Sequence, residues 1–282
     1  MCPSRAALAL PLTLLAVPPA HAQRQAFEAW GLAYTLPAGW QVAQQFGRVH
    51  GLTTGTPGSV LYVAPGMYQS FTEVAVDVNK GFQALGATGT ATGQPQASTV
   101  RGMQAMTATY VGQNPMGVTF QARVTAILTS HGTGLIVTGI APAEQMAPVA
   151  EAVDRVARSL EVVGAPRPNT QAIAALRGRW MLYAGRADGT TSASGGSSRS
   201  YEEFVEFDGT GRFAWQSSAS VMVTTPGYTG SAGGAQATND EGTYTVVGST
   251  LVAHGRQGQA NFELQILGDR IVADGRTYVR AN

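Results

Sequence analysis

The sequence predicts an α+β domain, in which two helices pack on an antiparallel sheet, followed by an all-β, eight-stranded up-and-down barrel. Up to residue 163, strand-like and helix-like stretches alternate. Beyond that point, nearly every stretch has the alternation of a β-strand and tight turns follow one another. The segment 164–169, Gly-Ala-Pro-Arg-Pro-Asn, separates the two regions, and its two prolines suit a short, semi-rigid linker.

Residues 1–22 have the three parts of a removable signal peptide. Arg5 gives the positive start, residues 6–17 form an apolar run, and Ala20-His21-Ala22 places small residues before the cleavage position. The apolar run is shorter than the ~20 residues that a membrane span needs. We expect cleavage after Ala22 and a periplasmic or secreted protein without an integral membrane segment; a retained N-terminal anchor is the alternative. The predicted units are a signal peptide (1–22), an α/β domain (23–163), a linker with a short helix (164–176) and the barrel (177–282).

The mature chain is predicted to be electrically neutral. Loss of Arg5 leaves 17 basic side chains against 17 acidic ones. Nucleic-acid binding through phosphates needs a basic surface, so this class of partner is set aside. Cys2, the single cysteine, lies in the removed segment, so the mature chain has no disulfide, thiol nucleophile or thiolate metal site.

The first region has the predicted order strands, helix, three strands, helix. Ser70 and Glu73 form a capping box at the start of a helix whose apolar spacing continues to Leu85. Pro142 begins the second helix, which runs to Leu160. The Gly-rich segment 86–93 is interpreted as a flexible connection. The stretches with strand-like character are 27–36, 46–54, 59–64, 103–112, 117–130 and 135–140.

Two short sequences in this region carry a resemblance to a known family. The stretch 34–40, YTLPAGW, is a common entry to PsbP-like domains, and the stretch 138–142, TGIAP, leads into a helix that ends in Arg-Ser-Leu at 158–160. Residues 24–163 therefore resemble the PsbP-like fold, an α/β/α sandwich named after an extrinsic subunit of photosystem II. That fold has no shared catalytic residues, so the resemblance implies an accessory or binding role and no site residue.

Eight strand-like runs follow the linker. Turn sequences such as Asp-Gly-Thr-Gly at 208–211 join most of them tightly. The two long connections, 186–199 and 224–240, are the first and the third, so both lie at one mouth of an up-and-down barrel. We interpret them as tolerated insertions, with ligand lids as the alternative. The runs are about 179–185, 200–208, 211–222, 241–247, 250–256, 260–267, 270–274 and 276–281.

Alternation also predicts which side chains fill the barrel. If Trp180 points inward, Phe207 and Trp215 lie near it at the tight end, and the smaller Ser217 and Ala219 lie higher. A barrel whose closed end is filled by large side chains, with smaller side chains above them, would suit one small apolar ligand. The candidate ligand-binding residues are Tyr201, Glu203, Ser217, Ala219, Tyr228 and Tyr244.

The barrel region carries a second resemblance, through Gly178-x-Trp180 in its first strand and Arg280 near its end. Residues 177–282 resemble short bacterial lipocalin-like barrels. The resemblance implies that Arg280 packs over Trp180 at the closed end, where Gly178 and Trp215 complete a structural base. The region lacks the C-terminal helix of full-length lipocalins.

Glu203 fits an apolar interior poorly, although alternation aims it inward. It could recognise a cationic or hydroxylated ligand. We favour the alternative, a solvated position at the mouth or a bulge that turns the side chain outward, because an unpaired buried carboxylate is costly.

The sequence offers no catalytic or metal-binding constellation. His50, His131 and His254 have no ligand partner at suitable spacing, and no hydrolase or metalloprotease motif occurs. We expect no cofactor and no enzyme activity. The predicted function is an exported binding or accessory protein that holds a small apolar ligand in the barrel. The alternative is a structural module with a filled barrel that docks on a cell-envelope protein complex.

Overall fold

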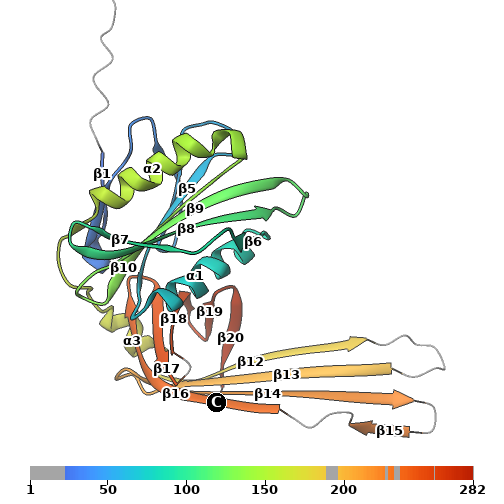
Figure 1. Ribbon diagram of the computed structural model, residues 1–282. Helices are drawn as coiled ribbons and strands as arrows, with labels where there is room; N and C mark the ends of the chain where they lie inside the picture. Colours follow the sequence, from blue (N-terminus) through green and yellow to red (C-terminus); the bar gives the residue numbers. More distant parts are fainter. Residues whose placement is uncertain (1–22, 189–195, 226–227, 232–235, 257, 282) are drawn as a thin grey trace, which may run out of the picture.

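The computed structural model describes residues 23–188, 196–225, 228–231, 236–256 and 258–281. Side chains are described for these residues except 183–188, 196–200, 219–225, 228–231 and 236–237. An α/β domain is followed by a short helix and an antiparallel barrel (Figure 1). The predicted fold class is therefore confirmed. The predicted signal peptide, 1–22, lies outside the described residues.

The α/β domain has two antiparallel sheets. The small sheet has the order β1-β2-β11, with β1 at Arg24–Phe27, β2 at Leu32–Thr35 and β11 at Glu161–Val162. The large sheet has the order β3-β4-β5-β10-β9-β8-β6, and β7 also pairs with β8. Its strands are β3 (Gln41–Phe46), β4 (Val49–Thr53), β5 (Val60–Met67), β6 (Thr88–Ala91), β7 (Gln96–Val100), β8 (Met103–Gln113), β9 (Thr119–Leu128) and β10 (Thr133–Ala141).

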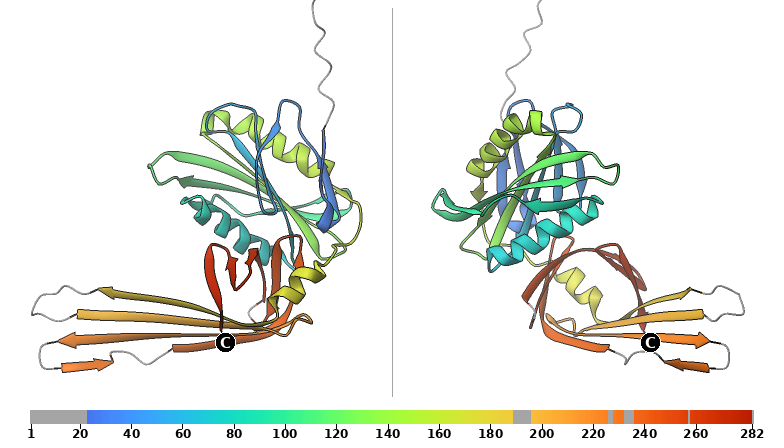
Figure 2. Two further views of the ribbon diagram at one scale, coloured as in Figure 1. Left: turned by 180° about the vertical axis from the view of Figure 1, so that it is seen from behind. Right: turned by 45° about the vertical axis from the view of Figure 1, so that its right-hand side comes forward.

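Two helices cover opposite faces of the large sheet (Figure 2). α1, Phe71–Ala84, buries Val74, Val78 and Phe82 against one face. α2, Met146–Ser159, packs its buried side with the other face and with the small sheet. Among the helices of the described residues, none is long and apolar enough to cross a membrane.

Several predicted boundaries in this domain were wrong. The stretch 27–36 is interrupted by a 3₁₀ turn, η1 (Glu28–Trp30), and by the left-handed Gly31. The segment 86–93 contains β6 rather than a free connection, and β7 was missed; both are short and mostly exposed, so they carry little apolar alternation. A second 3₁₀ turn, η2 (Ala143–Gln145), precedes α2. Ser70 caps α1 as predicted, by accepting from the Glu73 amide at 3.4 Å.

The second domain is a closed barrel of eight strands. β12, β13, β14, β16, β17, β18, β19 and β20 pair in sequence order, and β20 returns to β12; β15 pairs with β14 outside the circle. A short helix, α3 (Thr170–Leu176), precedes it. The strands are β12 (Gly178–Asp188), β13 (Gly196–Phe207), β14 (Arg212–Thr225), β15 (Tyr228–Ser231), β16 (Gln236–Val247), β17 (Thr250–Gly255), β18 (Gly258–Leu267), β19 (Arg270–Ala273) and β20 (Arg276–Ala281).

The barrel wall has unequal heights. β12, β13, β14 and β16 have 11 to 14 residues, whereas β17, β19 and β20 have 6, 4 and 6. The long strands continue beyond the short ones and project sideways (Figures 1 and 2). Much of the predicted connections 186–199 and 224–240 is therefore strand. The sequence did not indicate these strands, because they are rich in Ser, Thr and Gly and lack an apolar alternation.

The two domains pack together through apolar and backbone contacts. Val247 and Val252 of the barrel belong to the core that α2 covers. In the linker, Asn169 is fixed to the barrel by two hydrogen bonds. Its backbone amide donates to Val246 O at 2.7 Å, and its side-chain amide donates to Gly248 O at 3.0 Å. The segment predicted as a linker is thus bound to the barrel.

Candidate functional site

The closed end of the barrel is built around Trp180, which is fully buried. Its indole Nε1 donates to Leu176 O at 2.7 Å, so α3 covers this end. The Arg280 guanidinium lies 4.3 Å from the indole ring centre and donates to Arg177 O at 2.7 Å. The predicted contact between Arg280 and Trp180 is present.

Gly178 is required by this packing. Its φ of +121° is open to glycine but strained for other residues. A Cβ at this position would lie 2.7 Å from Arg280 Nη1. The Gly-x-Trp pattern therefore follows from the arginine that lies over the tryptophan.

Tyr244 lies in this base rather than in an open cavity. It is buried, packs edge to face with Phe207 at 4.7 Å and donates to Ile173 O at 3.3 Å. Leu176, Val246, Leu251, Leu264, Ile271, Ala273 and Tyr278 complete the buried core.

Above the base, Glu203 is the centre of a buried polar cluster. Glu203 as a whole residue is only 3% exposed. Oε1 accepts from the Tyr278 hydroxyl at 2.6 Å. Oε2 accepts from the Tyr201 hydroxyl at 2.6 Å and from Arg276 Nη2 at 2.5 Å. Both carboxylate oxygens are therefore occupied by donors from the protein.

The cluster keeps Glu203 ionised. Burial raises the pKa of its carboxyl group, but hydrogen bonds from Tyr201, Tyr278 and Trp215 and the charge of Arg276 outweigh burial, so the pKa lies below its ordinary value. Burial and the neighbouring carboxylate raise the pKa of Tyr278, which therefore remains a donor.

The favoured prediction for Glu203, solvation at the mouth or a bulge, was wrong. Its register is continuous with Leu182 on one side and Ser217 on the other, and its charge is compensated inside the barrel. Sequence reasoning missed Arg276 and Tyr278. The signal was present, because both have the same alternation phase as Arg280 on β20.

The other predicted ligand-binding residues are dispersed along the long strands. Ser217 is buried and its hydroxyl lies 2.6 Å from that of Thr238, at the level of Glu203. Trp215, which was predicted as part of the structural base, is half-buried in β14. Ala219 and Tyr228 lie in β14 and β15, and their side chains lie outside the described part of the chain.

The Glu203 cluster marks the upper limit of the closed wall. β20 begins at Arg276, and β19 ends at Ala273. β12 and β20 share only three register pairs, from Arg179↔Ala281 to Met181↔Val279. Glu203 on β13 reaches past β12 to Tyr278 and Arg276 on β20, so the cluster reinforces this short seam.

A second buried polar cluster lies between the domains and was not predicted. Arg48 of the β3–β4 turn donates from Nη2 to Asp77 Oδ2 at 3.0 Å and from Nε to Glu263 Oε1 at 2.9 Å. The Tyr68 hydroxyl donates to Asp77 at 2.8 Å. Asn261 of β18 exchanges two 3.2 Å hydrogen bonds with the backbone of Met67.

The Arg48 guanidinium remains charged in this cluster. Burial would lower its pKa, but Tyr68, Asp77 and Glu263 raise it above the ordinary value. Its ionic partners Asp77 and Glu263 lie 29 and 215 residues away in the sequence, so no sequence pattern identifies them.

The described histidines lie apart from both clusters. His50 is buried and forms a 2.9 Å hydrogen bond with the Tyr34 hydroxyl, whereas His131 and His254 are exposed. Within the described ranges, no group of three His, Cys, Asp or Glu side chains is arranged to hold a metal ion.

No protein-family model matches the chain, and no curated protein matches its sequence. Several solved structures, among them the following three, are similar to about half of it. Cyanobacterial PsbP (CyanoP) from Synechocystis sp. has a TM-score of 0.38 and 19% identity, over 52% of this chain and 95% of that one. LpqN, involved in cell envelope biogenesis of Mycobacterium tuberculosis, has a TM-score of 0.36 and 12% identity, over 51% of this chain and 86% of that one. PA94 from Pseudomonas aeruginosa, a putative regulator of unknown function, has a TM-score of 0.31 and 18% identity, over 53% of this chain and 99% of that one.

CyanoP is named as a PsbP protein, and the PsbP-like family is the one that residues 24–163 resemble in sequence. All three TM-scores are below 0.5, so these similarities carry no conclusion about activity, ligand or partner. The resemblance of the barrel to lipocalins stays a prediction.

Proposed function

We propose that this chain is an exported, non-catalytic accessory module that docks on a protein partner in the cell envelope. The observation that carries the proposal is the occupied barrel. α3, Trp180 and Arg280 close its lower end, and the Glu203 cluster fills the level at which its short strands end. A barrel whose described interior is filled by its own side chains favours the structural alternative over a ligand carrier.

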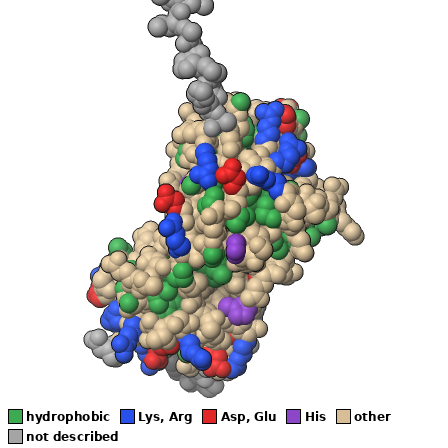
Figure 3. All heavy atoms as spheres, turned by 90° about the vertical axis from the view of Figure 1, so that its left-hand side faces the viewer, with side chains coloured by type: hydrophobic (Ala, Val, Ile, Leu, Met, Phe, Trp, Pro, Cys, Tyr) green, Lys and Arg blue, Asp and Glu red, His purple; other side chains and the backbone are tan. Residues whose placement is uncertain are grey.

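The chemistry of Glu203 supports a non-catalytic role. Each of its oxygens already accepts at least one hydrogen bond, and Arg276 neutralises its charge. A general base or nucleophile needs a carboxylate that a substrate can reach. Surface charge argues against a nucleic-acid partner: on the face in Figure 3, basic and acidic side chains are interspersed rather than gathered by sign. Export is supported by the predicted signal peptide at 1–22.

The proposal is tested by crosslinking in cells that express the full chain, followed by purification. We expect a specific protein adduct. Organic-solvent extracts of the purified protein are analysed by mass spectrometry, and quenching of Trp180 and Trp215 fluorescence by apolar probes is titrated. A stoichiometric extracted ligand with saturable quenching would establish the ligand carrier instead and overturn the proposal, as would the absence of any adduct.

A further inference from the structure

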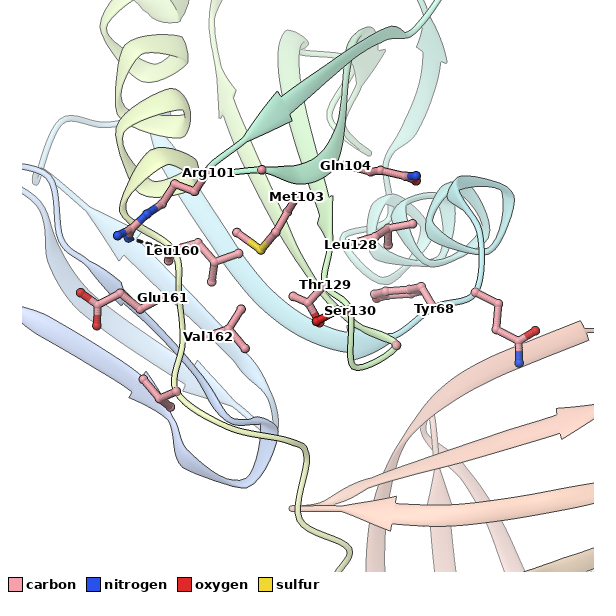
Figure 4. A pocket seen from close by; sticks show the side chains of 14 residues that line it. Tyr68, Arg101, Met103, Gln104, Leu128, Thr129, Ser130, Leu160, Glu161 and Val162 are labelled. Carbon is pink, nitrogen blue, oxygen red and sulfur yellow. Dashed lines mark hydrogen bonds between the residues drawn. The ribbon is translucent and has the colours of Figure 1, made fainter.

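A groove of about 1010 Å³ lies in the α/β domain, away from the barrel interior (Figure 4). Its walls come from four segments: residues 68–69 between β5 and α1, the β7–β8 turn with the start of β8, the end of β9 with its turn, and residues 160–163 after α2. It is partly open to solvent rather than fully enclosed. None of its lining residues takes part in the Glu203 cluster.

The middle of the groove is apolar. Met103, Leu160 and Val162 extend toward it in Figure 4. Leu160 is buried, but Val162 and Val163 are 38% and 54% exposed. Two adjacent exposed valines on a groove wall form a surface that a partner can cover.

A strand edge runs along the same wall. β11 pairs with β2 through Glu161↔Ala33, and the Val163 amide donates to Gly31 O at 2.8 Å. Backbone groups of an antiparallel strand alternate in direction, so the N–H and C=O of Val162 point away from β2, on the groove side. An added extended chain can pair there.

Arg101 places a positive charge at one end of the groove. Its Nη1 donates to Leu160 O at 3.0 Å, which holds the guanidinium against the end of α2 (Figure 4). Within the part of the chain that the structure describes, no carboxylate forms an ion pair with it, whereas nearby Glu161 is paired with Arg24 at 3.1 Å. Arg101 has a φ of +51° in a two-residue turn where Asn and Gly are the favoured residues. An arginine therefore occupies this position against the turn preference.

We propose that this groove binds an extended peptide of the partner protein, with the peptide's C-terminal carboxylate on Arg101. The apolar middle accepts its side chains, and the Val162 edge pairs with its backbone. The open shape favours a peptide over a lipid, because an apolar tail would remain largely in water. This inference rests on the proposed function only in taking the partner to be a protein.

The test uses the mature chain and a library of hexapeptides tethered by their N-termini, made with free C-terminal carboxylates or with C-terminal amides. Arg101→Asn removes the guanidinium and suits the left-handed turn better, so the fold is retained. Val162→Pro removes the outward N–H and leaves the Val163 hydrogen bond to β2 intact. Arg158→Gln, on the exposed end of α2, is the control with the same loss of charge.

We expect carboxylate peptides to bind and their amides to bind at least about tenfold more weakly, as for one lost charge-assisted hydrogen bond. Arg101→Asn and Val162→Pro should each weaken the carboxylate peptides, and Arg158→Gln should not. Equal binding to Arg101→Asn, or no peptide above background, would overturn the site. A cellular adduct that forms equally with Arg101→Asn would overturn the site while leaving the proposed function in place.

Discussion

The molecule holds two buried ionic clusters that differ in what surrounds the arginine. At the domain interface, the Arg48 side chain is 12% exposed and Asp77 is 6% exposed. In the barrel, Glu203 is 4% exposed but Arg276 is 46% exposed. The interface cluster is therefore buried on both sides of its ion pair, whereas the barrel cluster has one partner that water can reach. The comparison predicts that the same kind of substitution has unequal costs.

The largest effect is expected at Arg48. Arg48→Met keeps an apolar stem of similar length but leaves Asp77 and Glu263 without their cation. Loss of one partner of a buried pair costs about 3–5 kcal/mol, since the remaining charge stays desolvated. Urea unfolding followed by circular dichroism measures the change in the free energy of unfolding.

The control is Arg155→Met in the exposed Glu151–Arg155 pair of α2, for which we expect about 0.5 kcal/mol or less. If Arg48→Met cost no more than this control, the interface cluster would not hold the domains together.

A smaller effect is expected at Glu203. Glu203→Gln removes a charged acceptor from the Tyr201 and Tyr278 hydroxyls, but the half-exposed Arg276 regains water. We expect a loss of about 1.5–3 kcal/mol at pH 7, the range for hydrogen bonds to charged groups.

The cost of Glu203→Gln should also depend on pH. The pKa of Glu203 is lower in the folded than in the unfolded protein, so the folded state binds its proton less well. Its stabilisation is complete above the unfolded pKa of about 4.3 and is lost as pH falls through the lower folded pKa. Unfolding at pH 7 and pH 3 should show a smaller difference between Glu203→Gln and the natural chain at pH 3. A difference that is constant with pH would contradict an ionised Glu203.

These clusters also separate what the sequence predicts from what it does not. Period-two alternation and turn residues predicted the eight barrel strands, and the Gly178-x-Trp180 pattern with Arg280 predicted the closed end, because these signals are local or follow from barrel closure. Alternation aimed Glu203 inward, yet without its donors the burial of a carboxylate was judged too costly. The donors on β20, Arg276 and Tyr278, follow 73 and 75 residues later.

The interface cluster and the groove had no comparable signal. The β3–β4 turn brings Arg48 to Asp77 of α1 within the α/β domain, and Glu263 joins this pair because the barrel wall packs there. The groove forms where four separated segments approach, and short segments such as β11 carry no periodicity. Tertiary packing creates both features.

Arg280 provides the smallest effect and completes the comparison, since within the described residues no carboxylate forms an ion pair with it. It lies over Trp180 and donates to the carbonyl oxygens of Arg177 and Ala175. Arg280→Met should cost about 1–2 kcal/mol, from one cation–π contact near the surface and hydrogen bonds to neutral acceptors. Because carbonyl groups do not titrate, the cost should be the same at pH 7 and pH 3, unlike that of Glu203→Gln. Arg270→Met, whose 3.9 Å contact with Asp269 is exposed, is the matched control and should be nearly neutral. A cost for Arg280→Met that equals the cost at Arg48 would mean that burial of the arginine's partners does not determine the difference between the clusters.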